Sequence, residues 1–311
     1  MKLTDTNKLR EKRGVNLQKL LAPLALVIVY AFFALFGRNF FSYTTLVNIL
    51  DSSYYIGFIA IGVTFVIITG GIDLSCGTVM MAATIIGGTA YKTWGWPMWL
   101  SLLLILLVST SFGLFNGILV SRLKLPPFIA TLGTMMISLG TGSIVSNVRS
   151  ATFPARGAAD SWFKGIFKYI APNNASYPTG ALVLFGTAFI AYIILTRTKM
   201  GRYIFAVGSN KEAARLSGVN VAKWEMMAYV VSGFLAGVGG IAFAAVYTTV
   251  MPAQGQGFEL YAIAGTVIGG TSLSGGAGSV FGTMIGVYIM SVLRAGLPSM
   301  DLQSQYQTFF T

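Results

Sequence analysis

The sequence predicts an all-α polytopic membrane protein of about ten transmembrane helices, and three observations support this fold class. Of the 311 residues, 55% are hydrophobic and only 10% are charged, whereas a soluble domain carries about 25% charged residues. Apolar segments close to the roughly 20 residues that a spanning helix needs recur along the whole chain. Two of these segments are short, which indicates broken or re-entrant elements. We interpret residues 1–311 as one transmembrane domain.

Nine apolar segments are expected to form helices in the membrane. In chain order they are Leu20–Phe36, Tyr54–Thr69, Gly77–Ala90, Met98–Val120, Phe128–Val148, Ala181–Thr196, Met226–Val250, Leu260–Leu273 and Val280–Leu293. Gly77–Ala90 and Leu260–Leu273 are the two short segments. A tenth segment begins near Gln303–Thr311. Tyr306, Phe309 and Phe310 lead up to the end of the sequence, so we expect this C-terminal helix to be truncated.

The basic residues predict which side of the membrane each loop occupies, because cytoplasmic loops carry an excess of Lys and Arg. Placing the arm at residues 1–19 in the cytoplasm puts about two thirds of the 21 Lys and Arg residues inside. Residues 149–178 then form an outer loop, and residues 197–225 form a cytoplasmic loop. Membrane lipid headgroups account for the net charge of +12 without a nucleic-acid partner.

The segment Gly70–Gly77 joins two apolar segments and is a candidate for a transport pathway. Its sequence, GGIDLSCG, makes a poor helix interior. We therefore expect unwound backbone, which at membrane depth must be packed in protein or line a polar cavity. Asp73 either caps the helix that begins near Ser75, or caps it and also lines the pathway. The candidate pathway residues here are Gly70, Gly71, Asp73 and Ser75.

A second segment, Gly269–Gly276, resembles the first in its paired glycines and in the Leu-Ser pair that follows them. Glycine-rich elements at matching places in two halves of a chain are typical of transporters built from a repeat. The alternative is that glycine-rich turns look alike by composition alone. Six predicted crossings separate the two segments, which would place both on the same side. Further pathway candidates are Ser272, Ser274, Asn116 and Glu259, although Asn116 and Glu259 could instead be ordinary polar residues near span ends.

Small residues at helical spacing are expected to mediate helix packing. Gly233 and Gly237 lie one turn apart, and Gly278, Gly282 and Gly286 continue the same spacing in a later segment. Such residues allow helix backbones to approach closely. We interpret them as packing residues, not as substrate contacts.

The cytoplasmic loop is expected to contain one short helix. Ser209 or Asn210 would be its N-cap, Glu212 lies in its first turn, and Gly218 ends it. A helix this short does not persist alone in water, so we expect it to dock onto a partner. An interfacial helix on the lipid surface is the alternative. The candidate docking residues are Asn210, Glu212, Ala213, Ala214, Arg215, Leu216, Ser217 and Gly218.

Several function classes lack the residues that they require. The chain has no histidine and a single cysteine, Cys76, so neither a Cys/His metal site nor a nucleophile–base pair built on those residues is expected. No G-x-x-x-x-G-K-[ST] motif occurs, so energy must come from an ion gradient or from another subunit. A secondary transporter or channel for a small polar solute would have only Asp73 and Glu259 as in-membrane acids. No catalytic residues are predicted.

Four motifs, in order along the chain, resemble those of the permease subunits of bacterial ABC importers for ribose, xylose, galactose and related sugars. They are Gly70–Ser75, Pro126–Thr134, Gly201–Val219 and Gly269–Gly276. The resemblance covers nearly the whole chain from Leu20 onward. Four long motifs in the same order make the resemblance specific.

The resemblance implies a multi-pass protein of the bacterial inner membrane, with a cytoplasmic N-terminus, that imports a sugar or, in an importer of the same type, a nucleoside. It implies three partners: an ATP-binding cassette ATPase, which uses the ATP and magnesium, a periplasmic sugar-binding protein, and a second permease copy in a homodimer or a pair. No cofactor is expected in this chain. The coupling helix of such permeases falls on Asn210–Gly218, and Gly70–Ser75 would lie near the translocation path.

Two positions depart from the pattern of similar permeases. Tyr261 stands where those proteins often carry Asp, and Arg294 stands where they often carry Asn. A bulky phenol and a cation near the pathway are expected to mark a different substrate.

Overall fold

The computed structural model describes residues 5–172, 175–302, 305, 306 and 309, and the side chains from residue 21 onward. Within this part of the chain, six helices are long and apolar enough to cross a membrane. They are α2 (Tyr43–Ile68), α4 (Met98–Ser121), α5 (Pro127–Val145), α7 (Gly180–Arg197), α10 (Val221–Tyr247) and α12 (Val280–Ser299). The other α-helices are α1 (Asp5–Phe36), α3 (Cys76–Lys92), α6 (Lys164–Phe167), α8 (Lys199–Ser209), α9 (Lys211–Leu216) and α11 (Phe258–Ile268).

Strands occur only as two short antiparallel pairs among the described residues. β1 (Ala151–Thr152) pairs with β4 (Thr249–Val250), and β2 (Tyr169–Ile170) pairs with β3 (Ser176–Tyr177). A short 3₁₀ helix covers Ala159–Ser161. β1, β2 and β3, the 3₁₀ helix and α6 all belong to the loop at residues 149–178, so the described part of this loop contains secondary structure.

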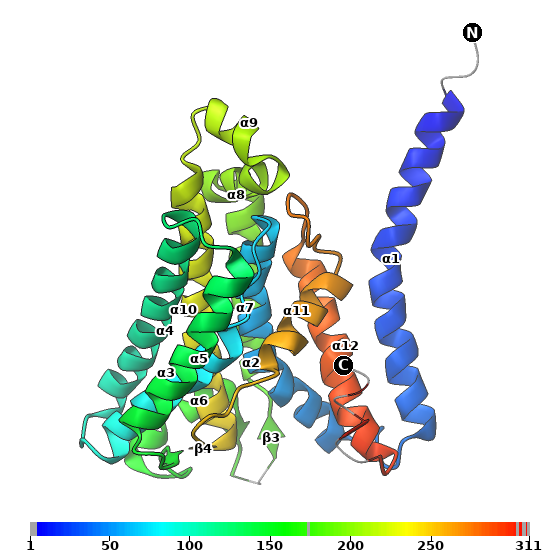
Figure 1. Ribbon diagram of the computed structural model, residues 1–311. Coiled ribbons are helices and arrows are strands. Elements are labelled where there is room, and N and C mark those ends of the chain that lie inside the picture. Colours follow the sequence, from blue (N-terminus) through cyan, green and yellow to red (C-terminus); the bar gives the residue numbers. More distant parts are fainter. Residues whose placement is uncertain (1–4, 173–174, 303–304, 307–308, 310–311) are drawn as a thin grey trace.

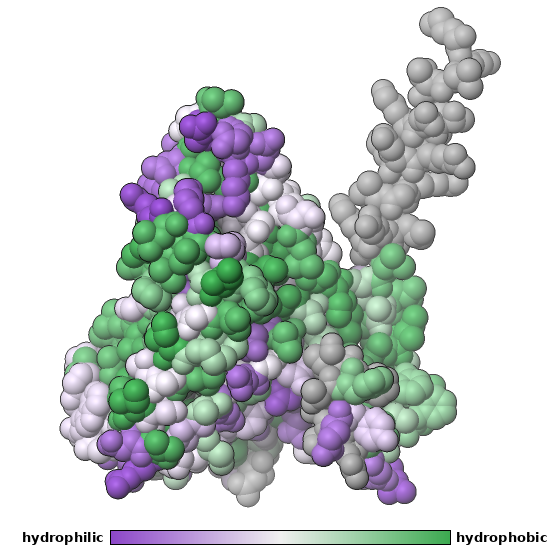
Figure 2. Space-filling model, in the orientation of Figure 1, coloured by the Kyte–Doolittle hydropathy of each residue, from purple (hydrophilic) through white to green (hydrophobic). Residues whose placement is uncertain are grey.

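The helices form one bundle around α2, whose most apolar stretch is wholly buried. α10 and α4 pack on one side of the bundle, and α1 stands at its edge beside α12 (Figure 1). α8, α9 and the start of α1 lie at one end, which we call the α9 end; loop 149–178 lies at the other, the loop end (Figure 1). Hydrophobic side chains cover the middle of the molecule, and hydrophilic ones gather at both ends (Figure 2). This distribution suits a protein whose middle is solvated by lipid.

Most predicted segments match helices within a few residues, but two begin earlier than predicted: α1 begins at Asp5 and not at Leu20, and α2 begins at Tyr43 and not at Tyr54. Ser42 caps the helix by accepting a hydrogen bond from the Thr45 backbone N–H. Ser52 and Ser53, which lie just before the predicted start, donate their hydroxyls to carbonyls three residues earlier in the helix. Most of the predicted tenth segment, Gln303–Thr311, lies outside the described residues and stays a prediction.

The two segments predicted to be broken elements are short helices, as expected. α3 has 17 residues and α11 only 11, so α11 is too short to cross a bilayer. Their N-terminal ends meet inside the bundle, since a Cβ added to Gly77 would lie 2.7 Å from the Glu259 Oε2 atom. The chain thus brings two helix starts together from segments far apart in sequence.

α4 and α10 cross without an intervening side chain, which confirms the predicted packing role of Gly233. A Cβ on Gly233 would lie 2.5 Å from the Ser109 carbonyl oxygen, and one on Gly113 would lie 2.4 Å from the Tyr229 carbonyl oxygen. Real Cβ atoms do not approach backbone oxygens this closely. Glycine on both helices is therefore required for this crossing.

We predict that Gly233→Ala destabilises the protein by about 1–3 kcal/mol, because the added methyl group forces two backbones apart. Thermal unfolding of the purified protein in detergent should show a melting temperature lowered by several degrees. Gly140→Ala is the matched control, since a Cβ there meets no atom within 4 Å. Equal melting temperatures for the two variants would contradict the close crossing.

Candidate functional site

The unwound segment between α2 and α3 holds a buried carboxylate network. Asp73 is 2% exposed, and its Oδ1 atom accepts hydrogen bonds from the Ser75 backbone N–H (3.0 Å) and from the Ser75 hydroxyl (2.7 Å). Its Oδ2 atom accepts from the Ser232 hydroxyl on α10 at 2.8 Å. The Asn116 side chain on α4 donates to the Ser75 hydroxyl at 2.8 Å. We call Asp73, Ser75, Asn116 and Ser232 the carboxylate network.

The structure differs from the predicted cap, in which Asp73 itself caps the helix. α3 begins at Cys76 with Ser75 as its N-cap residue, and Asp73 bonds the N–H of Ser75 instead of an N–H inside the helix. Three donors offset the cost of burying the carboxyl group, and the positive end of the α3 dipole favours a negative charge there. The predicted candidates Asp73, Ser75 and Asn116 thus form one unit.

Sequence reasoning missed Ser232, which completes this unit. Ser232 lies within the apolar segment Met226–Val250 and is buried on α10. A hydroxyl inside such an apolar segment needs a hydrogen-bond acceptor. This requirement was the sequence signal that could have identified Ser232. Ser232 is next to Gly233, where α10 crosses α4 closely. The Ser232 hydroxyl therefore reaches Asp73 beside this crossing.

Glu259 forms a second buried carboxylate in the first turn of α11. It is buried, and its Oε1 atom accepts a hydrogen bond from the Gly257 backbone N–H at 2.9 Å. Its Oε2 atom has no hydrogen-bond donor among the described residues and packs beside Gly77. The starts of α3 and α11 therefore meet with one acid each, an arrangement that the helix dipoles favour.

The two glycine-rich segments meet at the α9 end of the bundle. The Gly276 backbone N–H donates to the Ile68 carbonyl oxygen at 2.9 Å, so both segments lie at the same end, as predicted. Gly208 at the end of α8 fits between them: a Cβ there would lie 1.7 Å from the Ile68 oxygen and 2.5 Å from the Gly276 nitrogen. We call the contact of Ile68, Gly208 and Gly276 the glycine junction.

The remaining pathway candidates lie around the glycine junction and not in the carboxylate network. Gly70 and Gly71 follow Ile68 after one residue, Thr69, and a Cβ on Gly70 would come within 3.9 Å of the Ser274 carbonyl oxygen. Ser274 is exposed, and Ser272 is partly buried. The predicted pathway residues thus fall into two groups, one at the junction and one deeper at the helix starts.

The predicted short helix is present as α9, and Asn210 is its N-cap, because its side chain accepts a hydrogen bond from the Ala213 backbone N–H at 2.9 Å. Lys211 forms a 2.5 Å ion pair with Glu225, which ties α9 to the first turns of α10. Glu212 and Arg215 pair with each other at 2.9 Å on the exposed face. Leu216 ends the helix and is 80% exposed.

A single helix was predicted in this loop, whereas the structure also contains α8. Thr198 caps α8 by accepting from the Gly201 backbone N–H. Gly201, Ile204 and Val207 face the core, and this spacing of three was the missed signal. α8 carries Gly208 at its end and leads directly into α9, so it connects α9 to the glycine junction.

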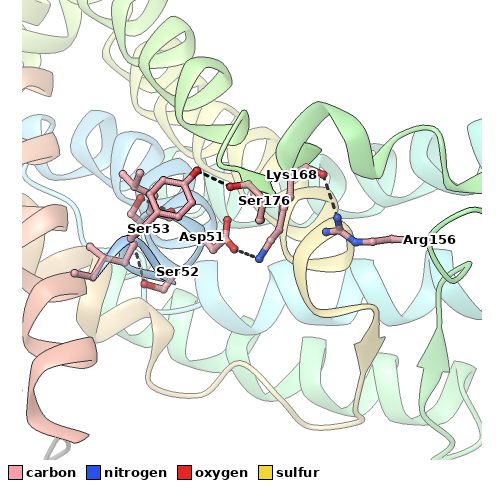
Figure 3. Close-up of polar contacts among 9 residues, drawn as sticks. Asp51, Ser52, Ser53, Arg156, Lys168 and Ser176 are labelled. Carbon is pink, nitrogen blue, oxygen red and sulfur yellow. Dashed lines mark hydrogen bonds and ion pairs between the residues drawn. The ribbon is translucent and has the colours of Figure 1, made fainter. Parts of the chain in front are cut away.

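Four ionisable side chains at the loop end form what we call the ionic cluster: Asp51, Arg156, Lys164 and Lys168. Lys168 forms an ion pair with Asp51 of α2, and Arg156 donates to the Lys168 carbonyl oxygen at 3.4 Å (Figure 3). The Lys164 ammonium donates to the Thr248 hydroxyl at 2.7 Å. Burial lowers the pKa of Lys164 to about 8. These contacts fasten loop 149–178 to α2 and to the end of α10.

The two positions that depart from the family resemblance lie in contact. The guanidinium carbon of Arg294 on α12 lies 5.6 Å from the ring centroid of Tyr261 on α11. The bulky phenol and the cation are therefore one feature of the structure. The two residues are 33 positions apart, so their spacing in the sequence could not predict this contact.

The chain matches a protein family over residues 45–311, and that family is described as the permease component of branched-chain amino acid transport systems. It is 35% identical to the ribose import permease protein of Haemophilus influenzae over 91% of this chain and 86% of that protein. It is also 35% identical to the fructose import permease protein of Rhizobium meliloti, over 91% of this chain and 79% of the relative. No solved structure matches the chain.

A third relative is the galactose/methyl galactoside import permease protein of Salmonella typhimurium. The two sequences are 34% identical over 91% of this chain and 88% of the relative. All three alignments cover most of both proteins, so the similarity concerns the whole fold and not one motif.

We predict that Asp73→Ala destabilises the protein by about 1–3 kcal/mol, because Ser75 and Ser232 lose their shared acceptor in a buried place. Asp73→Asn should keep most of the stability, since its amide oxygen can still accept from Ser75. Melting temperatures in detergent test both variants. Equal losses for the two variants would show that the negative charge, and not the acceptor geometry, supports the fold here.

The lowered pKa of Lys164 predicts a pH dependence. The pKa of Lys164 is about 8 in the folded chain and 10.5 ordinarily. Between these pH values Lys164 is protonated in the unfolded chain but deprotonated in the folded chain. The free energy of unfolding that Lys164 contributes therefore rises with pH in this range. The melting temperature of Lys164→Met should lack this rise relative to wild type. The exposed Lys92→Met control should keep it, and parallel pH profiles for all three proteins would contradict the prediction.

Proposed function

The chain belongs to the family of permease components of branched-chain amino acid transport systems. From this premise we propose the following function. It is the membrane-spanning subunit of an ATP-driven, binding-protein-dependent importer that carries a sugar of the pentose or hexose class across the bacterial inner membrane. The similarity to ribose, fructose and galactose import permeases supports a sugar as the substrate. ATP and magnesium would be used by a separate ATPase subunit, and this chain would not be an enzyme.

The observation that carries the proposal is the position and exposure of α9. This six-residue helix projects from one end of the bundle (Figure 1). It is held rigidly by its Asn210 cap and by the ion pair of Lys211 with Glu225. A fixed helix that presents an exposed leucine beside charged side chains has the features of a docking surface. We propose that α9 docks the ATPase.

A path of direct contacts leads from α9 to the candidate pathway residues. α9 follows α8 after Asn210, and Gly208 of α8 touches both Ile68 and Gly276 in the glycine junction. Ile68 ends α2, and the segment after it leads to Asp73 and the carboxylate network. We propose that ATP-driven closure of the ATPases moves α9 and α8 and thereby both glycine-rich segments, which opens the pathway alternately to each side.

The chemistry of the pathway candidates suits a hydroxyl-rich solute. The glycine-rich segments offer backbone groups and small hydroxyls, such as those of Ser272 and Ser274, that can exchange hydrogen bonds with a passing sugar. Strong binding inside the membrane would slow release. Affinity would therefore reside mostly in a periplasmic sugar-binding protein that delivers the substrate at the loop end.

The proposed topology places the α9 end and the N-terminus in the cytoplasm. It counts about ten membrane segments, because α1, α3, α11 and a segment near Gln303–Thr311 are added to the six long helices. The meeting of Gly70–Gly77 and Gly269–Gly276 at one end supports an internal repeat. A second permease copy, identical or related, would complete the membrane core.

We predict that Leu216→Asp abolishes co-purification of the permease with its ATPase. The exposed leucine would be a central apolar contact whose loss weakens binding by 2 kcal/mol or more, or roughly thirtyfold. Leu216→Met is the matched control and should bind within about twofold, since it conserves volume and apolarity. The double variant Glu212→Ala with Arg215→Ala should also lose the ATPase. If Leu216→Asp and the double variant reach the membrane and co-purify normally, α9 is not the docking helix.

A further inference from the structure

A groove of about 540 Å³ lies between α7 and α12. Aromatic and aliphatic side chains of both helices line it, among them Phe185, Phe189 and Tyr192 of α7 and Phe281, Ile285 and Tyr288 of α12. The rings of Phe185 and Tyr288 stack with their centroids 6.0 Å apart. We call this feature the α7/α12 groove.

The groove opens on a surface that faces lipid. The buried side chains of Ala188 and Met284 form its floor, whereas the rings of Phe185, Phe189 and Phe281 beside them are exposed. Both helices are long and apolar enough to span a membrane, so acyl chains and not water surround these rings. A polar solute would find few hydrogen-bond partners there, but an acyl chain can pack between the rings.

One end of the groove points toward the α9 end of the molecule. α7 follows loop 149–178 and leads into α8, whereas α12 follows Gly276 of the glycine junction, so the two helices run in opposite directions. The stacked rings of Phe185 and Tyr288 therefore lie on the loop side of the groove. Tyr192 and Phe281 lie on its α9 side.

Three basic residues, Arg197, Lys199 and Arg202, follow the groove on its α9 side. Arg197 comes five residues after Tyr192, which is about 7.5 Å further along the helix axis. All three side chains are exposed, and none of them forms an ion pair within the part of the chain that the structure describes. No acidic residue occurs at positions 180–210. The positive charge beside the groove is therefore not compensated locally.

The groove and the charges together fit an amphiphile that carries an anion at one end of an acyl chain. Basic side chains beside a gap between spanning helices bind anionic lipid headgroups, and an arginine can bind a phosphate through two N–H donors. A second copy of the chain suits the charges less. A two-fold axis along the membrane normal would place the same basic residues of both copies at one depth, where like charges repel.

We propose that the α7/α12 groove and the side chains of Arg197, Lys199 and Arg202 form a binding site for one anionic phospholipid. One acyl chain of the lipid lies in the groove, and the basic side chains bind its phosphate in the leaflet at the α9 end. Lys199 and Arg202 belong to α8, so the headgroup connects α7 with α8 across the extended residue Thr198. This inference goes beyond the proposed function and depends on neither an ATPase nor a sugar.

Native mass spectrometry of the purified permease tests the site by measuring which lipids the protein retains. Dioleoyl phosphatidylglycerol and dioleoyl phosphatidylethanolamine are added at equal concentrations, because they share their acyl chains and differ in net charge. Each wild-type chain should retain one phosphatidylglycerol in preference to phosphatidylethanolamine. Equal retention of the two lipids overturns the proposal, because it would show an apolar surface without a headgroup site.

The double variant Arg197→Gln with Arg202→Gln should weaken phosphatidylglycerol binding by roughly twentyfold, at about fivefold for each basic residue removed. The matched control is Arg122→Gln with Lys124→Gln, which removes two exposed basic residues just after α4. This control should leave binding nearly unchanged. Equal losses in the two double variants contradict the site, because they would show that lipid responds only to the overall charge of the protein.

Ile285→Trp tests the groove itself, because it fills the groove and keeps all three basic residues. Phosphatidylglycerol binding should fall by roughly tenfold, the loss expected when about two methylene groups of the acyl chain lose their contact. Unchanged binding, in a variant whose melting temperature shows that it is folded, contradicts an acyl chain in the groove. Unchanged binding together with the loss of a permease dimer would assign the groove to a second copy. Each of these contrary results would leave the importer function intact.

Discussion

The glycine junction is the contact on which the arrangement of the α9 end depends. Three segments from distant parts of the sequence meet there, and the Ile68 carbonyl oxygen accepts the Gly276 N–H at 2.9 Å. No side chain fits at Gly208, since even a Cβ would overlap the Ile68 oxygen. Backbone contacts of this kind cannot slide as side chains do, because packed interiors have discrete arrangements. A displacement of α8 must therefore move both glycine-rich segments.

A second constraint lies deeper, where α3 and α11 begin beside each other. Two helix starts at one place concentrate partial positive charge, and the chain balances it with Asp73 and Glu259. Asp73 accepts three hydrogen bonds, from Ser75 before α3 and from Ser232 on α10, whereas Glu259 has one oxygen bonded and one facing Gly77. The hydrogen bonds therefore restrain Asp73 more tightly than Glu259.

The apolar segments predicted the helices well, because lipid requires long runs of apolar residues whatever the tertiary structure. The predicted start of α2 was wrong, because the helix includes the polar residues Ser52 and Ser53, whose hydroxyls bond to carbonyls within the helix. The α9 cap at Asn210 could be predicted from local chemistry. The contacts of Ser232 with Asp73, and of Arg294 with Tyr261, could not, because they depend on how distant helices pack.

The crossing of α4 and α10 at Gly113 and Gly233 has a mechanical consequence. With no side chain between them, α4 and α10 pack as one rigid unit. The ion pair of Lys211 with Glu225 attaches α9 near the start of α10. α10 has 27 residues, which makes it about 40 Å long. A rotation of about 10° applied at α9 would displace Tyr247 by about 7 Å at this length. The paired helices would thus convert a small rotation of α9 at one face of the membrane into a displacement the size of a sugar ring at the other face.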